Sequence, residues 1–220
     1  MKKELIASAV SGALFVILLV LVRTFDVAAV GPAGTEIGLS GMNAAVHEAL
    51  GVNYFWYDLT EVFGFMALGI CALFGLMGLM QLVSRRSLLK VDRRILVLGA
   101  FYAVVIVCYV LFELVVVNYR PVIMLGETLP EASFPSSHTM LICCVMGSTV
   151  LMLKHYVKSF ELRVGLQAGC LVVAAVTVVG RLLSGVHWMT DIVGGVLLSC
   201  ALVALFAAMV KLAERLQPRE

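Results

Sequence analysis

Apolar and polar residues follow one another along this 220-residue chain in long blocks rather than in alternation. Six apolar runs approach or exceed the roughly 20 residues that an α-helix needs to cross a bilayer. We expect them at about residues 5–22, 59–83, 95–117, 137–153, 164–179 and 192–210. Because the runs lack the period-two pattern of strands, they predict membrane-spanning helices rather than a β-barrel.

The pattern therefore predicts an all-α polytopic membrane protein, with six transmembrane helices in one bundle and a single domain over residues 1–220. The composition agrees, since 62% of the residues are hydrophobic and 14% are charged. Soluble domains contain about 45–50% apolar and about 25% charged residues, so that class is excluded. The six cysteines fall in apolar runs without a C-x-x-C pair, and we expect packing residues rather than disulfides or metal ligands.

The segment between the first two runs, residues 24–58, is mixed in polarity and rich in glycine. Within it, five apolar residues recur at helical spacing and predict a short amphipathic helix in the membrane interface: Met42, Ala45, Val46, Ala49 and Leu50. The aromatic residues 54–57 are typical of a membrane belt. We expect His47 to be an interfacial surface residue rather than a ligand.

The first apolar run follows Lys2 and Lys3, so a secretory signal peptide cleaved near residues 27–29 is an alternative. The run is longer than the usual apolar region of a signal peptide, and five more spans follow. We therefore favour an uncleaved first helix.

Lysine and arginine are unevenly divided between the two sides of the predicted bundle. With six spans both termini lie on one side, and 13 of the 16 basic residues fall there. Only Arg23, Arg120 and Arg181 fall on the other side. The positive-inside rule therefore places the termini in the cytoplasm. The 13 are Lys2, Lys3, Arg85, Arg86, Lys90, Arg93, Arg94, Lys154, Lys158, Arg163, Lys211, Arg215 and Arg219.

Three polar clusters fall on that outer side, each at the end of a predicted helix. They are Arg120-Pro121 after the third span, Pro135-Ser136-Ser137-His138 before the fourth, and the stretch 180–191 between the fifth and sixth. A phosphate group requires several converging donors and cations, which two arginines, serine hydroxyls and helix N-terminal amides supply. Two histidines then allow one to attack phosphorus and the other to donate a proton.

His187 and Asp191 stand four residues apart in the third cluster. If this segment is helical, the imidazole and the carboxylate share one face, a turn apart. The carboxylate then holds the ring in one tautomer and stabilises its charged form. Arg181 adds a planar cation suited to phosphate oxygens.

These motifs resemble the type 2 phosphatidic acid phosphatase (PAP2) superfamily of membrane lipid phosphatases. Its pattern is K-x6-R-P, then P-S-G-H, then S-R-x5-H-x3-D, and this chain matches it in order and spacing. The resemblance implies that His187 is the nucleophile, that Asp191 orients it and that His138 protonates the leaving group. It also implies that Arg120, Arg181, Ser136 and backbone amides near Ser137 bind phosphate, and that no metal or other cofactor takes part.

The chain departs from that pattern at three positions, where Ser137 replaces a glycine, Gly180 a serine and Glu113 a lysine. Glu113 is the serious change, because an ionised carboxylate repels phosphate. It is expected to pair with Arg120 or Arg181, to be protonated when buried, or to contact a substrate hydroxyl or amine. Tyr119, a second candidate modulator, either contacts phosphate or closes the bundle end.

The function predicted is hydrolysis of a lipid phosphomonoester or diphosphate through a phosphohistidine, at the extracytoplasmic face of a bacterial plasma membrane. The leading substrate is polyprenyl (undecaprenyl) diphosphate, followed by phosphatidate and phosphatidylglycerol phosphate. The expected partners are this substrate and membrane lipids, not nucleic acid, and the oligomeric state stays open.

Two alternatives belong to other classes of function: a six-helix transporter and a weakly active, phospholipid-binding relative. Glu113 is taken as the only ionisable residue well inside a span, which argues against a transport path. A zinc site at His138, His187 and Asp191 is disfavoured because the nearby arginines repel a cation.

Overall fold

A computed structural model describes residues 1–124 and 126–215 of the chain. This part is all-helical, and six of its helices are long and apolar enough to cross a membrane. The six predicted spans and the short helix between the first two are therefore confirmed. The helices are α1 (Lys2–Thr24), α2 (Ser40–Leu50), α3 (Tyr54–Arg85), α4 (Arg93–Leu114), α5 (Ser137–Tyr156), α6 (Phe160–Leu183) and α7 (Met189–Arg215), with short 3-10 turns η1 (Pro32–Gly34) and η2 (Leu88–Lys90).

Most of the spanning helices extend beyond the apolar runs that predicted them, and two of these extensions affect the site. α3 begins at Tyr54 rather than near residue 59, because Asn53 caps it by accepting a hydrogen bond from the Phe55 amide at 3.1 Å. α6 continues to Leu183, so Arg181 lies in its last turn and not in the loop beyond it. Hydropathy locates the apolar part of a helix, whereas caps decide where the helix begins.

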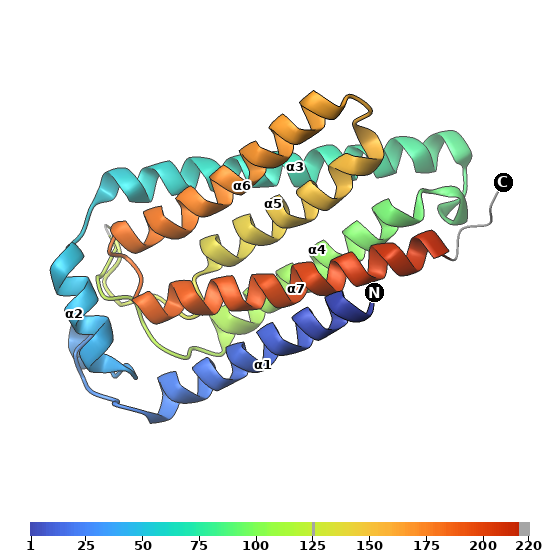
Figure 1. The fold of residues 1–220 in the computed structure, drawn as a ribbon. Helices are drawn as coiled ribbons and strands as arrows, with labels where there is room; N and C mark the ends of the chain where they lie inside the picture. Colours follow the sequence, from blue (N-terminus) through green and yellow to red (C-terminus); the bar gives the residue numbers. More distant parts are fainter. Residues whose placement is uncertain (125, 216–220) are drawn as a thin grey trace.

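The long helices lie side by side along one direction, and α2 crosses one end of the bundle (Figure 1). α5 is the internal helix, because it packs against α3, α4, α6 and α7. It is also the least apolar span, and half of its most apolar stretch is buried inside the bundle. Its hydroxyl groups are accommodated because Ser148 and Thr149 donate to the Val145 carbonyl at 3.0 and 2.7 Å.

An aromatic cluster fixes the loop between α4 and α5 against the bundle. Phe134 of this loop is 1% exposed, and its ring centroid lies 5.8 Å from Phe15 of α1 and 6.4 Å from Phe112 of α4. Burial of a phenylalanine side chain stabilises a fold by about 1.5–3 kcal/mol. The residues that follow Phe134 are thereby held at the start of α5.

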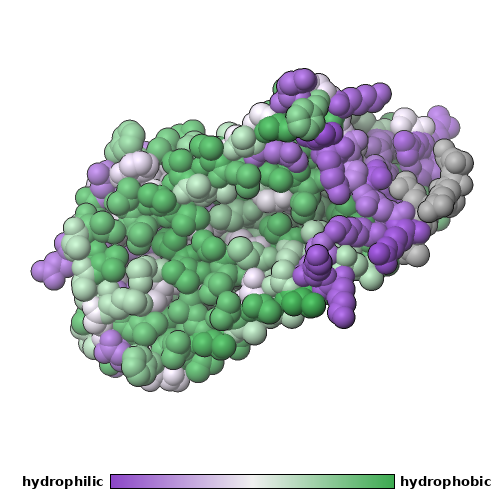
Figure 2. Space-filling model, viewed as in Figure 1, coloured by the Kyte–Doolittle hydropathy of each residue, from purple (hydrophilic) through white to green (hydrophobic). Residues whose placement is uncertain are grey.

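Apolar side chains cover the middle of the molecule in the view of Figure 2, and hydrophilic ones gather at the end where α1 begins and α7 ends. α2 and the junction of α6 with α7 lie at the opposite end (Figure 1). This distribution accords with the predicted division of basic residues. One of the 13 residues of that count, Arg219, lies outside the described residues.

α2 is bound to the first turn of α7. The Asn43 side-chain nitrogen Nδ2 donates to Thr190 Oγ1 at 3.0 Å, and the Thr190 backbone amide donates to Asn43 Oδ1 at 3.2 Å. His47, expected to be an interfacial surface residue, is half-buried, and its ring lies 5.5 Å from that of Trp188. Met42 and Leu50, from the predicted apolar face, remain exposed and available to lipid.

The loop between α6 and α7 depends on a close backbone approach at Gly185. This residue has φ +68°, and a Cβ there would lie 2.0 Å from the carbonyl oxygen of Gly51. The neighbouring Ser184 carbonyl accepts the Asn53 amide at 3.1 Å. The end of α2 and the start of α3 therefore lie directly against the loop that precedes α7.

We predict that Gly185→Ala destabilises the protein. The left-handed backbone alone costs about 1–2 kcal/mol for a residue with a side chain, and displacing Gly51 adds to this. Thermal unfolding in detergent should show a lower Tm. Gly169→Ala in α6 is the control, because a Cβ there meets nothing within 4 Å and alanine favours a helix. Equal Tm values for the two variants would contradict the prediction.

Candidate active site

The loop between α4 and α5 folds back on itself and carries two of the predicted clusters to the start of α7. Tyr119 and Ala132 form an isolated antiparallel bridge. The Arg120 amide donates to the Glu131 carbonyl at 3.0 Å, and the Ser133 amide to the Asn118 carbonyl at 3.1 Å. This register places Asn118 and Ser133 side by side.

Asp191 is the fully buried centre of the site. Asn118 donates to its Oδ1 at 3.0 Å, the Trp188 amide donates to its Oδ2 at 2.9 Å, and the Ser133 hydroxyl also donates to Oδ2. The Ser136 amide donates to its backbone carbonyl at 3.0 Å. As the third residue of α7, Asp191 also satisfies an amide at the helix start and lies at the positive end of the helix dipole.

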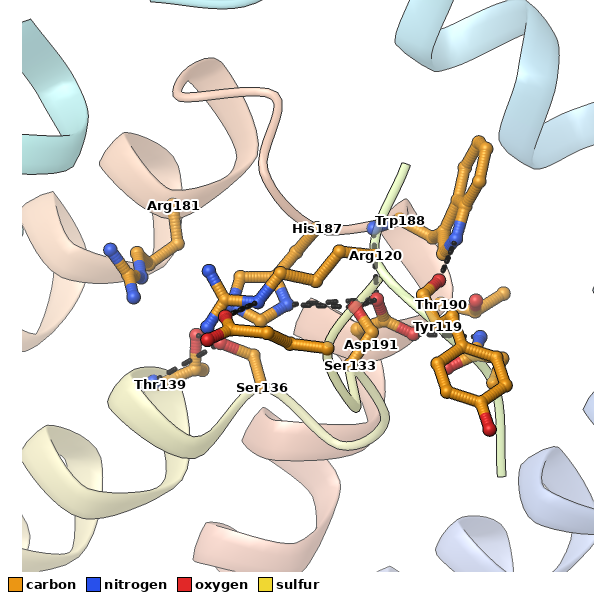
Figure 3. A network of polar contacts seen from close by, with 12 residues as sticks. Tyr119, Arg120, Ser133, Ser136, Thr139, Arg181, His187, Trp188, Thr190 and Asp191 are labelled. Atoms are coloured by element: carbon orange, nitrogen blue, oxygen red, sulfur yellow. Dashed lines mark hydrogen bonds and ion pairs between the residues drawn. The ribbon is translucent and has the colours of Figure 1, made fainter. Parts of the chain in front are cut away.

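His187 is brought to Asp191 by a third residue rather than by a helical turn. α7 begins at Met189, so His187 precedes the helix, which corrects the expectation that the two side chains share a helical face. His187 Nδ1 lies 3.7 Å from Asp191 Oδ2, too far for a hydrogen bond, but 3.0 Å from Ser133 Oγ. Because the Ser133 hydroxyl donates its hydrogen to Asp191, its oxygen accepts from Nδ1–H of His187. The three side chains lie next to one another in Figure 3.

This contact leaves the other ring nitrogen of His187 available. Nε2 is buried and has no hydrogen-bond partner among the described residues. The pKa of His187 is lowered well below its ordinary value of 6.5, first by burial and then by the charges of Arg120, Arg181 and the nearby His138. The ring is therefore neutral near pH 7, with a lone pair on Nε2.

Arg181 and His138 belong to a second polar network on the other side of the site. Arg181 is fully buried, and its Nη2 lies 2.7 Å from His138 Nδ1. Its Nη1 donates to Thr60 Oγ1 at 3.2 Å and to Glu61 Oε1 at 3.3 Å. The guanidinium carbon lies 5.0 Å from the centre of the Tyr57 ring, a cation–π contact.

Glu61 completes this network and was missed by the sequence analysis. Its Oε1 lies 3.0 Å from His138 Nε2 as well as 3.3 Å from Arg181 Nη1. Because α3 begins at Tyr54, Glu61 lies two turns inside a spanning helix, so Glu113 is not the only ionisable residue well inside a span. An acidic residue within a spanning helix is a functional signal, and this one was overlooked because the helix start was placed too late.

The two serines of the second cluster begin α5. Ser136 is its N-cap, and its Oγ accepts from the Thr139 amide at 3.4 Å and from the Thr139 hydroxyl at 3.0 Å. The Ser136 hydroxyl hydrogen remains available to donate. Ser137 is the first helical residue, where backbone amides lack partners within the helix and attract anions.

Arg120 extends across the site toward Ser136 and Arg181 in the view of Figure 3. Its side chain is largely buried, and its Nε lies 3.2 Å from Glu131 Oε2. Tyr119 takes part through its backbone carbonyl, which accepts from Trp188 Nε1 at 2.7 Å. The Tyr119 ring points away from the arginines and His187 in Figure 3, so its phenol does not contribute to this arrangement.

Glu113 does not pair with either arginine. In the described structure, Arg120 pairs with Glu131 and Arg181 with Glu61, whereas no ion pair involves Glu113. The expected pairing is therefore wrong, because closer carboxylates from the α4–α5 loop and from α3 occupy both cations. Glu113 instead lines a small hollow with Ser133, Pro135 and Ser137.

The three predicted clusters thus meet at one end of the membrane bundle and surround a buried, unpartnered histidine nitrogen. This combination defines a membrane protein with a site suited to phosphate chemistry. A sequence model of the PAP2 superfamily matches residues 95–215, more than half of the chain, and the chain belongs to this superfamily.

The fold also matches a solved structure. A PAP2-type phosphatidylglycerolphosphate phosphatase from Bacillus subtilis superposes with a TM-score of 0.63 over 97% of this chain and 99% of its own. The two sequences are 19% identical, so this match shows that the two chains share a fold. A search of curated protein sequences found no match.

We predict that Ser133→Ala slows phosphorylation of His187. Without the hydroxyl, Nδ1–H loses its acceptor and the ring loses its link to Asp191. The outer hydrogen-bond partner of a metal-bound histidine is worth about 10- to 100-fold in activity, and we expect a loss of the same size here. The rate of a single turnover should fall by about this factor, with little change in KM.

Two further variants test whether Ser133 acts through Asp191. Ser133→Thr keeps the hydroxyl and should recover most of the rate. In an Asp191→Asn background, Ser133→Ala should add less than about 3-fold, because residues in one network are not additive. Full additivity of the two losses would contradict the relay.

The lowered pKa of His187 predicts how the first step depends on pH. A neutral ring is the reactive form. With p-nitrophenyl phosphate, whose leaving group needs no proton from His138, the single-turnover rate for the substrate dianion should therefore stay constant as the pH falls from 8 to 6.5. The loss of rate should begin only below 6.5, where an ordinary histidine is already half protonated. A rate that rises through an apparent pKa of 6.5 or higher, and that is lost in His187→Ala, would disprove the assignment.

Proposed function

We propose that this protein is a lipid phosphatase in which His187 is the nucleophile. One observation carries this proposal: four buried nitrogens of the site lack a hydrogen-bond partner within the described residues. They are His187 Nε2, Arg181 Nε, Arg120 Nη1 and Arg120 Nε, and only the last of them is in an ion pair, with Glu131. Leaving buried polar groups without partners costs about 1–3 kcal/mol each or more for charged groups. One nucleophile and two cationic side chains in this state match a phosphoryl group.

In the first step, the lone pair of His187 Nε2 forms a bond to phosphorus while the bond to the leaving-group oxygen breaks. His138 supplies a proton to that oxygen, and the leaving group departs as an alcohol from a phosphomonoester or as the lipid monophosphate from a diphosphate. Arg120 and Arg181 neutralise the phosphoryl oxygens, assisted by the Ser136 hydroxyl and the amides at the start of α5. As the His187 ring gains positive charge, its Nδ1–H continues to donate to Ser133, whose hydroxyl donates to Asp191.

In the second step, water attacks the phosphohistidine and His138 accepts its proton. The bond between Nε2 and phosphorus breaks, phosphate is released and His187 regains its lone pair. Each of these transfers uses groups that this chain supplies, and none requires a metal. His138 thus acts first as an acid and then as a base, as microscopic reversibility requires of two consecutive displacements.

A groove beside His138 supports a substrate that remains in the membrane. This cavity of about 300 Å³ lies among α3, α4 and α5 and is bounded at one place by Ser137 and His138. Its other lining is mainly apolar: Leu68, Val105, Ile106, Tyr109, Met140 and Leu141. A hydrocarbon chain lying here would place its ester oxygen at the proton donor.

The particular lipid follows from family analogy rather than from the lining of this groove. We retain polyprenyl diphosphate as the leading substrate, with phosphatidate and phosphatidylglycerol phosphate next. The structural relative from Bacillus subtilis, which is described as a phosphatidylglycerolphosphate phosphatase, supports the inclusion of the last of these.

The site is proposed to face the outside of a bacterial plasma membrane. Hydrophilic residues gather at the end of the bundle where α1 begins and α7 ends, and the site lies at the opposite end. Anionic phospholipids and the insertion machinery favour basic residues on the cytoplasmic side. The enzyme would therefore process headgroups displayed in the outer leaflet.

Purified protein should release inorganic phosphate from a panel of these lipids with EDTA present. His187→Ala should lower the rate at least about 1,000-fold, because the covalent route is lost. Conservation of the rate in His187→Ala, or absence of release from every lipid, would overturn the proposal. Lipid or ion flux in liposomes that survives His187→Ala would indicate a transporter instead.

A further inference from the structure

Glu61 comes from α3, outside the residues 95–215 that match the superfamily model. It nevertheless contacts His138 and Arg181, two residues of the proposed reaction. We propose that Glu61 is a positioning residue that holds His138 and stabilises its protonated form for transfer of a proton to the leaving group. This inference rests on the proposed phosphatase function.

The contacts of His138 define where its protons lie. A guanidinium group only donates hydrogen bonds, so Nδ1, which lies 2.7 Å from Arg181 Nη2, is an acceptor in this resting state. The ring proton is then on Nε2, 3.0 Å from Glu61 Oε1. Glu61 therefore fixes the tautomer and the orientation of the ring.

The two ring nitrogens face different parts of the molecule. Nε2 faces Glu61 on α3, whereas Nδ1 faces Arg181, whose unpartnered Nε marks the phosphoryl side. A bound phosphoryl group draws the Arg181 donors to its oxygens and releases Nδ1, which takes a proton from solvent. The imidazolium then donates from Nδ1 to the leaving oxygen while its Nε2–H stays on Glu61.

A carboxylate in this position favours the charged ring, as Asp191 does through Ser133 for His187. After the transfer, His138 is neutral again, and Nδ1 accepts the proton of the water that attacks the phosphohistidine. The site therefore contains two histidines, each supported by its own carboxylate. One pairing passes through Ser133 and the other is direct.

α3 presents one face that is built around this pairing. Tyr57, Thr60, Glu61 and Gly64 follow the helical spacing of one surface, and all four lie against Arg181 or His138. A Cβ at Gly64 would lie 3.4 Å from His138 Cδ2 and 3.5 Å from Nε2, so the glycine allows the ring to approach the helix. Contact of this kind indicates a dedicated support for the ring.

The test uses two substrates that differ in how much the leaving group requires a proton. The leaving group of an alkyl lipid monoester such as phosphatidate is a basic alkoxide that needs a proton. The leaving group of p-nitrophenyl phosphate is a weakly basic phenolate that departs without one. Glu61→Gln keeps a hydrogen-bond acceptor but removes the charge. General acid catalysis typically contributes about 100- to 10,000-fold, and Glu61→Gln removes only part of it because His138 remains. We expect kcat for phosphatidate to fall about 10- to 100-fold and kcat for p-nitrophenyl phosphate less than about 3-fold.

Three further variants complete the experiment. In a His138→Ala background, Glu61→Gln should cause no additional loss. Glu61→Asp retains the charge and should recover part of the phosphatidate rate, which also shows that the site folds without Glu61. Glu48→Gln is the matched control, since it removes one carboxylate from the exposed side of α2 and should leave both rates unchanged.

Equal losses for the two substrates, or an additional loss in the His138→Ala background, would overturn the assignment of Glu61. Both results leave the proposed phosphatase function intact, because the wild-type protein still releases phosphate and His187→Ala does not. If the wild-type protein hydrolyses neither substrate, the proposed function fails, and this inference fails with it.

Discussion

The buried carboxylate of Asp191 is the constraint on which the site depends. A charge held away from water is costly unless donors surround it, so its position determines where those donors must be. Asn118 and Ser133 come from the folded loop between α4 and α5, and the Trp188 amide comes from the start of α7. Satisfying one side chain therefore joins segments that are some 70 residues apart. The same contacts determine the side from which His187 offers its free nitrogen.

The two arginines of the site are subject to the same constraint, because a buried cation also needs polar partners. Arg181 is buried at the end of a spanning helix and Arg120 is nearly so, and each has a carboxylate within 3.3 Å. These pairings hold the guanidinium groups in place without using all of their donors, because one nitrogen of each remains unpartnered. The network is thus neutralised enough to be stable in the membrane and still incomplete enough to bind an anion. Glu113, which replaces the family lysine, has no part in this neutralisation.

The membrane setting explains the division between a rigid interior and a reactive end. α5 is the least apolar of the spans and packs against four others, so its N-terminal residues are held firmly. The catalytic candidates lie at helix ends, where backbone amides are unsatisfied and polar side chains reach the interface. Beside them, the groove of about 300 Å³ gives a lipid chain a route to His138 that stays within apolar surroundings.

The sequence alone determined the all-α bundle, its six spans and the interfacial helix, because the period and length of apolar runs report directly on burial in a bilayer. It also identified most candidate site residues, since motif spacing is a local property of the chain. The tertiary structure decided their partners. Ser133 rather than direct contact links His187 to Asp191, Glu131 rather than Glu113 pairs with Arg120, and Glu61 reaches His138 from a distant helix. Such pairings depend on how helices and loops pack in space, and no spacing along the sequence encodes them.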